Sequence, residues 1–376
     1  MRVSCLQENL AKGLAIVGRA VATRGTLPIL SNVLVATDNA RLKLSATNLE
    51  LGINCWVGAK VEQDGAITVP ARLLTDLVNS LPPDRIDMEL QTRTQTLTLR
   101  CGRFEASIKG IDAHEFPIVS TVDEDRAVPV DPQTLRDMIG QVTFAASTDE
   151  TRPVLTGVLT ELGPKGIVMV AADGYRLSLR TAEVSAGDSQ AQVIIPARAL
   201  QELARVSAEE QEPVRLVISQ SRSQAFFRLS NIDLITQLID GSFPPYQSII
   251  PRSYNTRTVL NTAEFQKAVR LASLFARDNN NVVRLRIEPA SDVTPGKVVV
   301  SATSSELGSN VGELEATVEG SPIEIAFNGR FLAEVLAVID SAQVALETNT
   351  PASPGVVRPV GGADFLHVIM PMHISK

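Results

Sequence analysis

The order of apolar and polar residues predicts both half-exposed strands and amphipathic helices. Apolar and polar residues alternate with a period of two in Thr94–Arg100 and Arg284–Glu288, the pattern of strands that face a core on one side. Residues 8–22 instead follow the helical period of about 3.6 residues. The buried stripe of this predicted helix is Leu10, Leu14, Val17 and Val21. Many strands with few helices indicate α+β domains with largely antiparallel sheets.

A second amphipathic helix is predicted in each third of the chain. Its buried face is Leu73, Leu74, Leu77 and Leu81 in the first third, Leu200 and Leu203 in the second, and Phe331, Leu332, Val335 and Ile339 in the last. Arg72, Arg198 and Arg330 occupy the same outward-facing position on these three helices. Gly and Pro clusters at Asp292–Gly296 and Pro351–Gly362 predict a turn and a longer loop.

These elements recur in the same order, which identifies an internal repeat. Phe116-Pro117, Phe243-Pro244 and Met370-Pro371 follow one another at intervals of 127 residues. The opening helices align at Leu10, Leu135 and Phe265, and a strand before each turn aligns at Leu44–Thr47, Val170–Asp173 and Val300–Thr303. We therefore predict three homologous domains, 1–123, 124–251 and 252–376, joined at the polar stretches Asp123–Arg126 and Pro251–Thr256. Each domain is expected to contain two helices.

The net charge of the chain and the distribution of its cations point to different functions. The net charge of −7 and the pI near 5.2 are unlike those of most DNA-binding proteins. Nevertheless, cations recur on the predicted helices or, for Arg24, just past a helix end, at Lys12, Arg19, Arg24, Arg72, Arg198, Arg205, Lys267 and Arg330. Asp137 interrupts the series in the middle repeat. Exposed helix positions often carry cations for solubility alone, but a three-fold recurrence favours contacts with a phosphate backbone, which do not depend on base sequence.

The sequence lacks the motifs of the common enzyme and metal-site classes. Cys5, Cys55 and Cys101 have no ligand or redox spacing and are expected to be buried thiols, and the histidines form no ligand motif. No phosphate-binding glycine motif or catalytic pairing is present, so no cofactor and no catalytic residue are expected. With no apolar run long enough to span a membrane and no signal-peptide pattern, a cytoplasmic protein is expected.

Over its whole length the chain resembles the bacterial sliding clamp, the beta subunit of DNA polymerase III. The resemblance lies in the motifs Thr26–Asn32, Ala171–Leu177, Phe243–Tyr246, Phe327–Arg330 and Val368–Met372. It implies a non-enzymatic processivity factor in which two copies of three clamp domains close head to tail into a six-domain ring around duplex DNA. The helices would line the hole, and an external ATPase, the clamp loader, would open the ring.

The resemblance also implies two protein-binding surfaces. The dimer interface would use Ala106 and Ile108 on one side and Leu274 and Phe275 on the other. An apolar cleft would bind short motifs of the polymerase III alpha subunit, the clamp loader, and other polymerases and repair proteins. Its residues would be Leu155, Gly174, Tyr175, Arg176, Leu177, Pro244, Ile249, Val368, Ile369, Met370, Pro371 and Met372.

Some positions depart from the family pattern, and two other functions stay open. His373 stands where arginine is frequent and Ala172 where threonine is frequent, while Pro153-Val154 replace aromatic residues that some members present to DNA. A clamp paralogue with an accessory or inhibitor-resistance role is the first alternative, and an enzyme with an unrecognised site is the second. Binding of the polymerase C-terminal motif separates the paralogue from the main interpretation.

Overall fold

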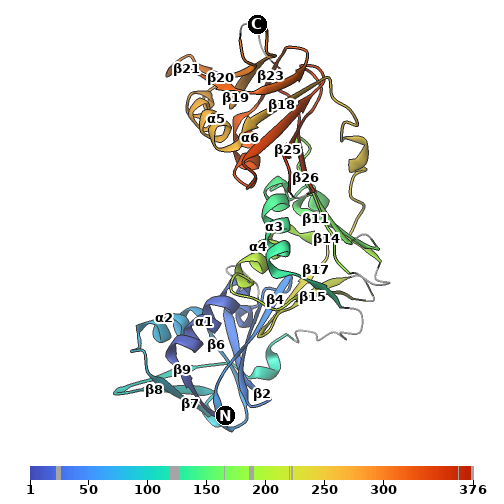
Figure 1. The fold of residues 1–376 in the computed structure, drawn as a ribbon. Coiled ribbons are helices and arrows are strands. Elements are labelled where there is room, and N and C mark those ends of the chain that lie inside the picture. Colours follow the sequence, from blue (N-terminus) through green and yellow to red (C-terminus); the bar gives the residue numbers. More distant parts are fainter. Residues whose placement is uncertain are drawn as a thin grey trace. The chain divides into compact units, whose positions relative to one another are not determined.

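The computed structural model describes residues 1–22, 27–117, 127–164, 166–185, 190–219, 221, 223–292, 294–362 and 364–373. By internal contacts the chain forms two compact units, residues 1–133 with 199–238 and residues 134–198 with 239–376. Figure 1 shows the elements of both units. The middle repeat is thus divided, because its strands pair with strands of both neighbouring repeats.

The first unit contains two antiparallel sheets. The five-stranded sheet has the order β5 (Lys60–Gln63), β1 (Arg2–Leu6), β7 (Arg85–Gln91), β8 (Thr96–Cys101) and β9 (Phe104–Lys109). The eight-stranded sheet has the order β10 (Val128–Val130), β15 (Val214–Ile218), β16 (Gln224–Arg228), β17 (Ile232–Gln237), β4 (Leu51–Val57), β3 (Arg41–Thr47), β2 (Asn32–Asp38) and β6 (Ala66–Pro70). The β4–β17 pair, with Cys55 opposite Ile232, joins the first repeat to the middle one.

The second unit repeats this plan. Its nine-stranded sheet has the order β14 (Ala191–Pro196), β11 (Gly157–Gly163), β12 (Gly166–Ala172), β13 (Arg176–Ala182), β26 (Phe365–Ile369), β25 (Gly355–Pro359), β24 (Gln343–Thr348), β18 (Thr256–Asn261) and β22 (Thr317–Gly320). The four-stranded sheet has the order β21 (Gly308–Glu315), β20 (Lys297–Ser304), β19 (Val282–Glu288) and β23 (Ile323–Asn328). Here the β13–β26 pair joins the middle repeat to the last.

Six α-helices lie in the described part of the chain, two in each repeat. They are α1 (Gln7–Val17), α2 (Ala71–Ser80), α3 (Pro132–Val142), α4 (Ala197–Val206), α5 (Thr262–Ala276) and α6 (Gly329–Leu336). Short 3₁₀ turns are η1 (Gly18–Ala20), η2 (Pro28–Ser31), η3 (Thr92–Thr94), η4 (Ala113–Glu115), η6 (Thr143–Ala145), η7 (Pro153–Thr156) and η8 (Tyr246–Ser248). The α+β class with antiparallel sheets is confirmed.

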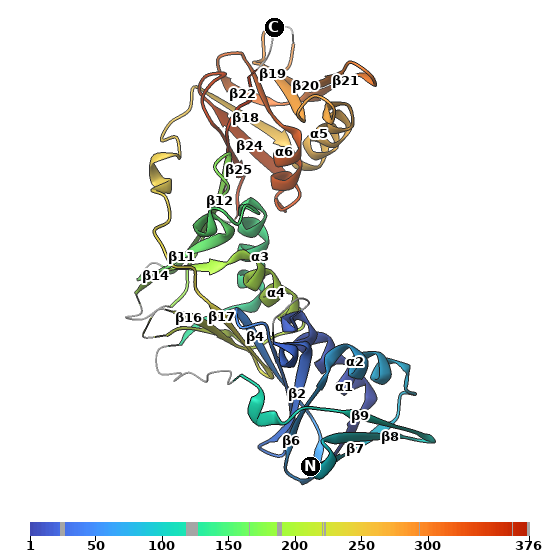
Figure 2. The ribbon, with the colours of Figure 1, turned by 180° about the vertical axis from the view of Figure 1, so that it is seen from behind.

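The last repeat shows how the local sequence sets these elements. The side chain of Asn261 accepts a hydrogen bond from the Glu264 N–H and begins α5, and Asn328 does the same for α6 with the Arg330 N–H. In Figure 2, α5 and α6 lie side by side against the strands. Their apolar faces, with Phe265 and Leu332 fully buried, complete the core of this repeat.

The predicted helix faces are confirmed in part. Leu10, Leu14 and Val17 are buried, and Leu200, Leu203, Leu332 and Val335 are buried as well. The first helix ends at Val17, where a single 3₁₀ turn replaces the predicted continuation to Ala22.

Three predictions were wrong. The strand β8 is not half-exposed, because Thr96 and Thr98 are buried along with its leucines and only Arg100 is exposed. Leu73 is 54% exposed, because Ala71, Leu74 and Val78 form the buried face of α2. The predicted loop Pro351–Gly362 contains the strand β25, since the β-branched residues Val356 and Val357 enter the core while Gly355 and Pro359 only bound the strand. The predicted joint Asp123–Arg126 lies outside the described residues.

Candidate functional site

An exposed apolar surface forms where the turn between β12 and β13 meets the end of β26. Tyr175 is 65% exposed and Met370 is 40% exposed. The two are held together because the Met370 N–H donates to the Tyr175 carbonyl at 2.9 Å. Gly174 has a φ of +96°, a conformation that glycine adopts without strain, and it lets the turn project Tyr175 outward. We call Tyr175, Ile249 and Met370, with the buried residues below them, the apolar site.

The floor of the apolar site is a hydrophobic cluster. Leu177 on β13 lies opposite Val368 on β26, and both are buried in one cluster with Tyr246. Ile369 is buried in the adjacent core of the last repeat. These buried side chains hold in place the backbone that carries the exposed Tyr175 and Met370.

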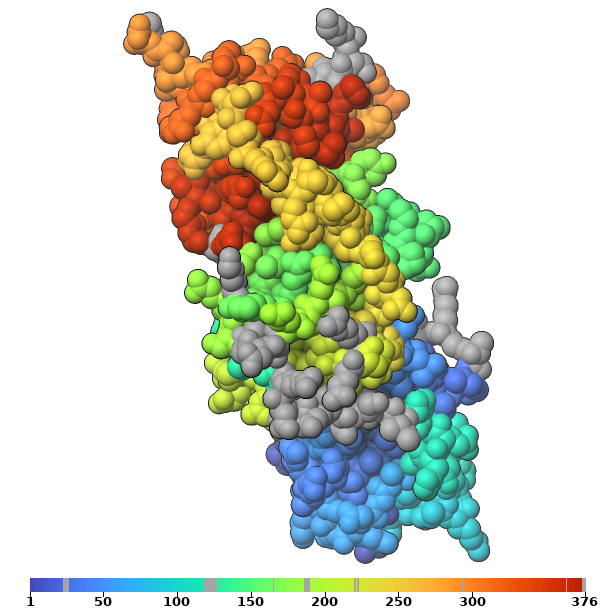
Figure 3. Space-filling view, turned by 90° about the vertical axis from the view of Figure 1, so that its right-hand side faces the viewer, coloured from blue at the N-terminus to red at the C-terminus, as the bar shows by residue number. Residues whose placement is uncertain are grey.

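The connecting segment 239–255 forms one side of the apolar site. This segment, gold in Figure 3, crosses the surface of the second unit. It is anchored by Tyr246, whose hydroxyl donates to Glu161 Oε2 at 3.1 Å and whose pKa is raised to about 12 by burial and by that carboxylate. The half-buried Phe243 and Ile250 pack on the same cluster as Leu177, and their neighbours Pro244 and Ile249 are exposed.

The 3₁₀ turn η7 borders the site on another side and carries the half-buried Leu155. A Cβ at Gly241 would lie 2.7 Å from Val154 Cγ2, and a Cβ at Gly174 would lie 3.3 Å from Arg152 Nη1. Residues 152–155 therefore lie against both the connecting segment and the Tyr175 turn. The predicted residues Pro371 and Met372 follow Met370 and are half-buried.

The sequence did not reveal the residues that surround Arg176. Its side chain is only 6% exposed and forms ion pairs with Asp173 and with Glu334 of α6. The rings of Phe331 and Phe144 lie 4.2 and 5.4 Å from the guanidinium carbon. These partners are far apart in sequence, with Glu334 158 residues from Arg176, and no local pattern indicated that they meet.

His367 lies beneath the same region, paired with a serine, but it does not make a catalytic pair. Its Nδ1 lies 2.6 Å from Ser178 Oγ, and both residues are fully buried. Burial and the nearby Arg176 lower the pKa of His367 to about 3. A neutral imidazole that substrate cannot reach supports packing rather than proton transfer.

The predicted DNA-contact residues lie on exposed helix positions. Lys12, Arg19, Arg72, Arg198, Arg205, Lys267 and Arg330 are all exposed at the surface, whereas Arg24 lies outside the described residues. Most also have an acidic neighbour: Glu202 accepts from Arg19 at 3.0 Å and from Arg205 at 2.6 Å. Beside this shared carboxylate the side chains of Arg19 and Arg205 remain 39% and 56% exposed.

The predicted interface residues lie on an edge strand, β9 with Ala106 and Ile108, and on the helix α5 beside the edge strand β21, with Leu274 and Phe275. β9 is the last strand of the five-stranded sheet and β21 is the last strand of the four-stranded sheet, as far as the described residues show. Leu274 is 47% exposed and Phe275 half-buried, while on β9 Ala106 is half-buried and Ile108 is buried within its own unit. A hollow of about 520 Å³ between α5 and β21 is lined by Lys267, Leu271 and Val311 among others.

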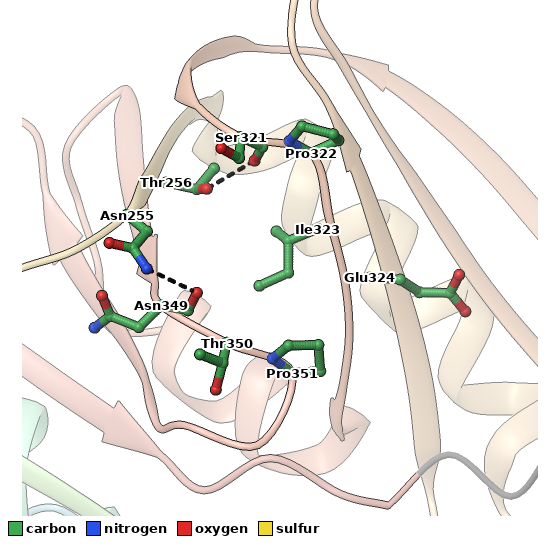
Figure 4. Close-up of a pocket in the computed structure, with 9 residues that line it drawn as sticks. All are labelled: Asn255, Thr256, Ser321, Pro322, Ile323, Glu324, Asn349, Thr350 and Pro351. Carbon is green, nitrogen blue, oxygen red and sulfur yellow. Dashed lines mark hydrogen bonds between the residues drawn. The ribbon is translucent and has the colours of Figure 1, made fainter.

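A separate pocket of about 420 Å³ lies beside β18 and β22 (Figure 4). Its polar walls bond to each other: the Thr256 hydroxyl donates to the Ser321 carbonyl at 2.7 Å, and the Asn255 amide donates to the Asn349 carbonyl at 3.3 Å. Glu324 points away from the hollow (Figure 4). The pocket therefore presents little that could bind a charged ligand.

Cys5, Cys55 and Cys101 are free and buried thiols. Burial raises the pKa of Cys5 to about 12 and that of Cys55 to about 11, which makes both thiols poor nucleophiles. Within the described residues no group of three or more metal-ligating side chains is found. None of the helices in the described ranges is long and apolar enough to cross a membrane.

Comparisons with known proteins cover nearly the whole chain. Three sequence profiles of the DNA polymerase III beta subunit match in order: its N-terminal domain at residues 1–120, its central domain at 129–245 and its C-terminal domain at 247–373. The chain is 32% identical to the beta sliding clamp of Synechococcus elongatus over 100% of both chains. It is 30% identical to that of Bacillus subtilis over 99% of both. The crystal structure of the Bacillus subtilis DNA polymerase sliding clamp superposes with a TM-score of 0.94 at 28% identity, covering 100% of both chains.

Proposed function

The chain belongs to the DNA polymerase III beta subunit family, the bacterial sliding clamps, and we propose that it acts as a ring of two copies around duplex DNA. Such a ring retains DNA by topology, so that weak contacts are sufficient and sliding stays possible. The observation that carries the proposal is the way in which the repeats join each other. Strand pairing joins the first repeat to the second and the second to the third. By analogy, we expect a third strand pairing between the last repeat of one copy and the first repeat of another.

The third link requires a second copy. At both internal junctions the last strand of one repeat, β17 or β26, pairs with the strand after the turn of the preceding repeat, β4 or β13. The corresponding strands at the two ends of the series are β9 and β21, and both lie at sheet edges in the described part of the chain. Pairing β21 of one copy with β9 of another covers both edges and closes a head-to-tail dimer.

Side chains at equivalent positions support this closure. Phe144 and Phe331, which pack on Arg176 at an internal junction, correspond in the repeat to Leu274 and Leu73. Leu274 and Leu73 are both about half exposed. We propose that Leu274 and Phe275 of one copy pack near Leu73, Ala106 and Ile108 of the other, which explains why α2 carries an exposed leucine.

The helices supply the DNA contacts in this proposal. Cations on or beside the helices, three of them at the same position of each repeat, contact successive phosphates without reading bases, which gives sequence-independent and salt-sensitive binding. The residues are Lys12, Arg19, Arg24, Arg72, Arg198, Arg205, Lys267 and Arg330.

The apolar site serves as the partner-binding surface. A flexible methionine beside an exposed tyrosine accepts varied aliphatic and aromatic anchors of short peptides. We assign it to motifs of the polymerase III alpha subunit, the clamp loader and repair proteins. In this proposal the protein catalyses no reaction and acts in the cytoplasm. Its three domains are bounded at residues 123 and 251.

The first test is the solution mass of the purified protein across a dilution series. Light scattering is expected to give twice 40.4 kDa, and Leu274→Asp is expected to halve that mass by placing a charge in the apolar contact. Leu49→Asp is the matched control, because Leu49 is an exposed turn residue with a φ of +78° that aspartate tolerates.

A second assay tests function directly. With a clamp loader present, the protein is expected to stimulate the host polymerase on circular primed DNA, and cutting the circle is expected to release it. A monomer at micromolar concentration would remove the ring. Absence of stimulation on circular DNA by a dimeric protein would instead favour an accessory paralogue.

A further inference from the structure

Each of the three nitrogens of the Arg176 guanidinium donates a hydrogen bond within the protein, and the side chain is only 6% exposed. Nε donates to Asp173 Oδ2 at 3.0 Å, Nη2 donates to the Phe144 carbonyl at 2.7 Å, and Nη1 donates to the Glu334 carboxylate. The rings of Phe144 and Phe331 pack beside the same group. Arg176 therefore has little left to offer a bound peptide, and its contribution to the apolar site is indirect.

The backbone beside Arg176 presents the exposed residues of the site. Asp173 Oδ1 accepts hydrogen bonds from the N–H groups of Tyr175 and Arg176, while Oδ2 accepts from the Arg176 side chain. The Tyr175 carbonyl in turn accepts from the Met370 N–H. The Arg176 side chain thus fixes the turn from which Tyr175 projects and to which the Met370 backbone is hydrogen-bonded.

Glu334 holds the far end of this arrangement from the last repeat. It lies on α6, where it accepts from Arg176 through Oε2 and from Arg330 Nε through Oε1 at 2.8 Å. Burial alone would raise the pKa of Glu334. Hydrogen bonds from Arg330 and Arg176 outweigh this effect and keep the pKa below its ordinary value. The carboxylate is therefore charged at neutral pH and compensates an arginine that is almost completely desolvated.

We infer that Glu334 is a positioning residue of the apolar site: through Arg176 it sets the Asp173–Arg176 turn and hence the orientation of Tyr175 and Met370 for peptide binding. The inference rests on the proposed function of the apolar site. It assigns to α6, a helix proposed to face DNA, a second role in shaping a surface that it does not itself line.

The repeat supplies a matched position in the other unit. Glu202 stands on α4 where Glu334 stands on α6, and it also accepts from two arginines, Arg19 and Arg205. Glu202→Gln therefore removes the same charge from the same kind of arginine pair. It leaves Asp173, Tyr175 and Arg176 untouched.

The experiment compares Glu334→Gln with Glu202→Gln in the full-length protein. The first readout is the affinity for a fluorescent peptide that copies the C-terminal motif of the host replicative polymerase. Glu334→Gln is expected to weaken binding about 3- to 30-fold, the range of long-range coupling, and Glu202→Gln to leave it within about 2-fold.

The second readout is independent of the peptide. The chain has three tyrosines, so protein labelled with 3-fluorotyrosine gives one ¹⁹F resonance each for Tyr175, Tyr246 and Tyr254. Glu334→Gln is expected to shift or broaden the Tyr175 resonance and to leave that of Tyr254 unchanged, which also verifies folding. Tyr→Phe variants assign the three signals.

Unchanged affinity in Glu334→Gln would overturn the inference, whether or not the Tyr175 resonance moves. Equal losses in Glu334→Gln and Glu202→Gln would overturn it as well, because the effect would then be one of general stability. Wild-type protein that does not bind the peptide would overturn the proposed function of the site. In that case a Tyr175 resonance unaffected by Glu334→Gln would still refute the positioning of the turn.

Discussion

At the scale of single residues, His367 carries a pH-dependent part of the stability. It is buried in neutral form with a pKa of about 3, so between its ordinary pKa near 6.5 and that value the unfolded chain binds a proton that the folded chain does not. Stability therefore falls as the pH falls through this window, by at most about 1.4 kcal/mol per pH unit. We predict that urea unfolding at pH 7 and pH 5 shows a smaller pH effect in His367→Asn. His373→Asn, at an exposed site, is expected to retain the wild-type dependence, and an equal effect in both variants would contradict this prediction.

At the scale of elements, α6 depends on its N-cap residue, Asn328. Its span, Gly329–Leu336, is shorter than isolated helices that persist in water, and it begins with glycine. The cap bond from the Arg330 N–H to the Asn328 side chain at 3.0 Å therefore matters. We predict that Asn328→Ala lowers the unfolding free energy by about 1 kcal/mol. Asn328→Asp keeps the acceptor and adds a favourable charge at the helix start, so denaturant unfolding of this variant is expected to match or exceed the wild type. Equal losses in both variants would show that the cap bond is not the cause.

At the scale of the whole molecule, the charge of −7 and the proposed DNA contacts are compatible because the relevant cations lie on helices. We predict that replacing Arg72, Arg198 and Arg330 together by alanine reduces the salt dependence of binding to a short duplex. The log–log slope falls by about 0.9 for each phosphate contact removed. Fluorescence anisotropy across a sodium chloride series measures this slope. The control replaces three exposed strand arginines, Arg2, Arg85 and Arg286, and a similar change of slope there would indicate a general charge effect.

The repeat made much of this fold predictable. Two helices per repeat, the buried stripe of α1 and the alternation in β19 follow from local periodicity, whereas β8 is buried at Thr96 and Thr98 as well as at its leucines. The exposure of Leu73 could not be predicted from periodicity. The pattern shows that the position is apolar, but it does not show whether the side chain packs within the chain or against another copy. The strand β25 was hidden by flanking glycine and proline, whose local preference is overridden by the pairing with β24 and β26.

The residues of the candidate site were predictable only from motifs shared with a known family, not from their individual chemistry. Tyr175, Leu177 and Val368 were placed by resemblance, and the structure brings them together with Met370. Glu334 and Phe144 were missed as parts of the site, because an arginine can pair with many acids and nothing local selects one 158 residues away.

The pairing of β4 with β17 has a consequence during synthesis on the ribosome. β4 ends at Val57, but its partner is complete only at Gln237, so 180 further residues must be translated before the eight-stranded sheet can form. At about 5 to 20 residues per second, the apolar edge of β4 waits roughly 9 to 36 s in the nascent chain. The same delay recurs for β13, which waits for β26 near the C-terminus. Each neighbouring repeat thus protects the one before it, and a chain truncated before Ile232 would leave the edge of β4 open to aggregation.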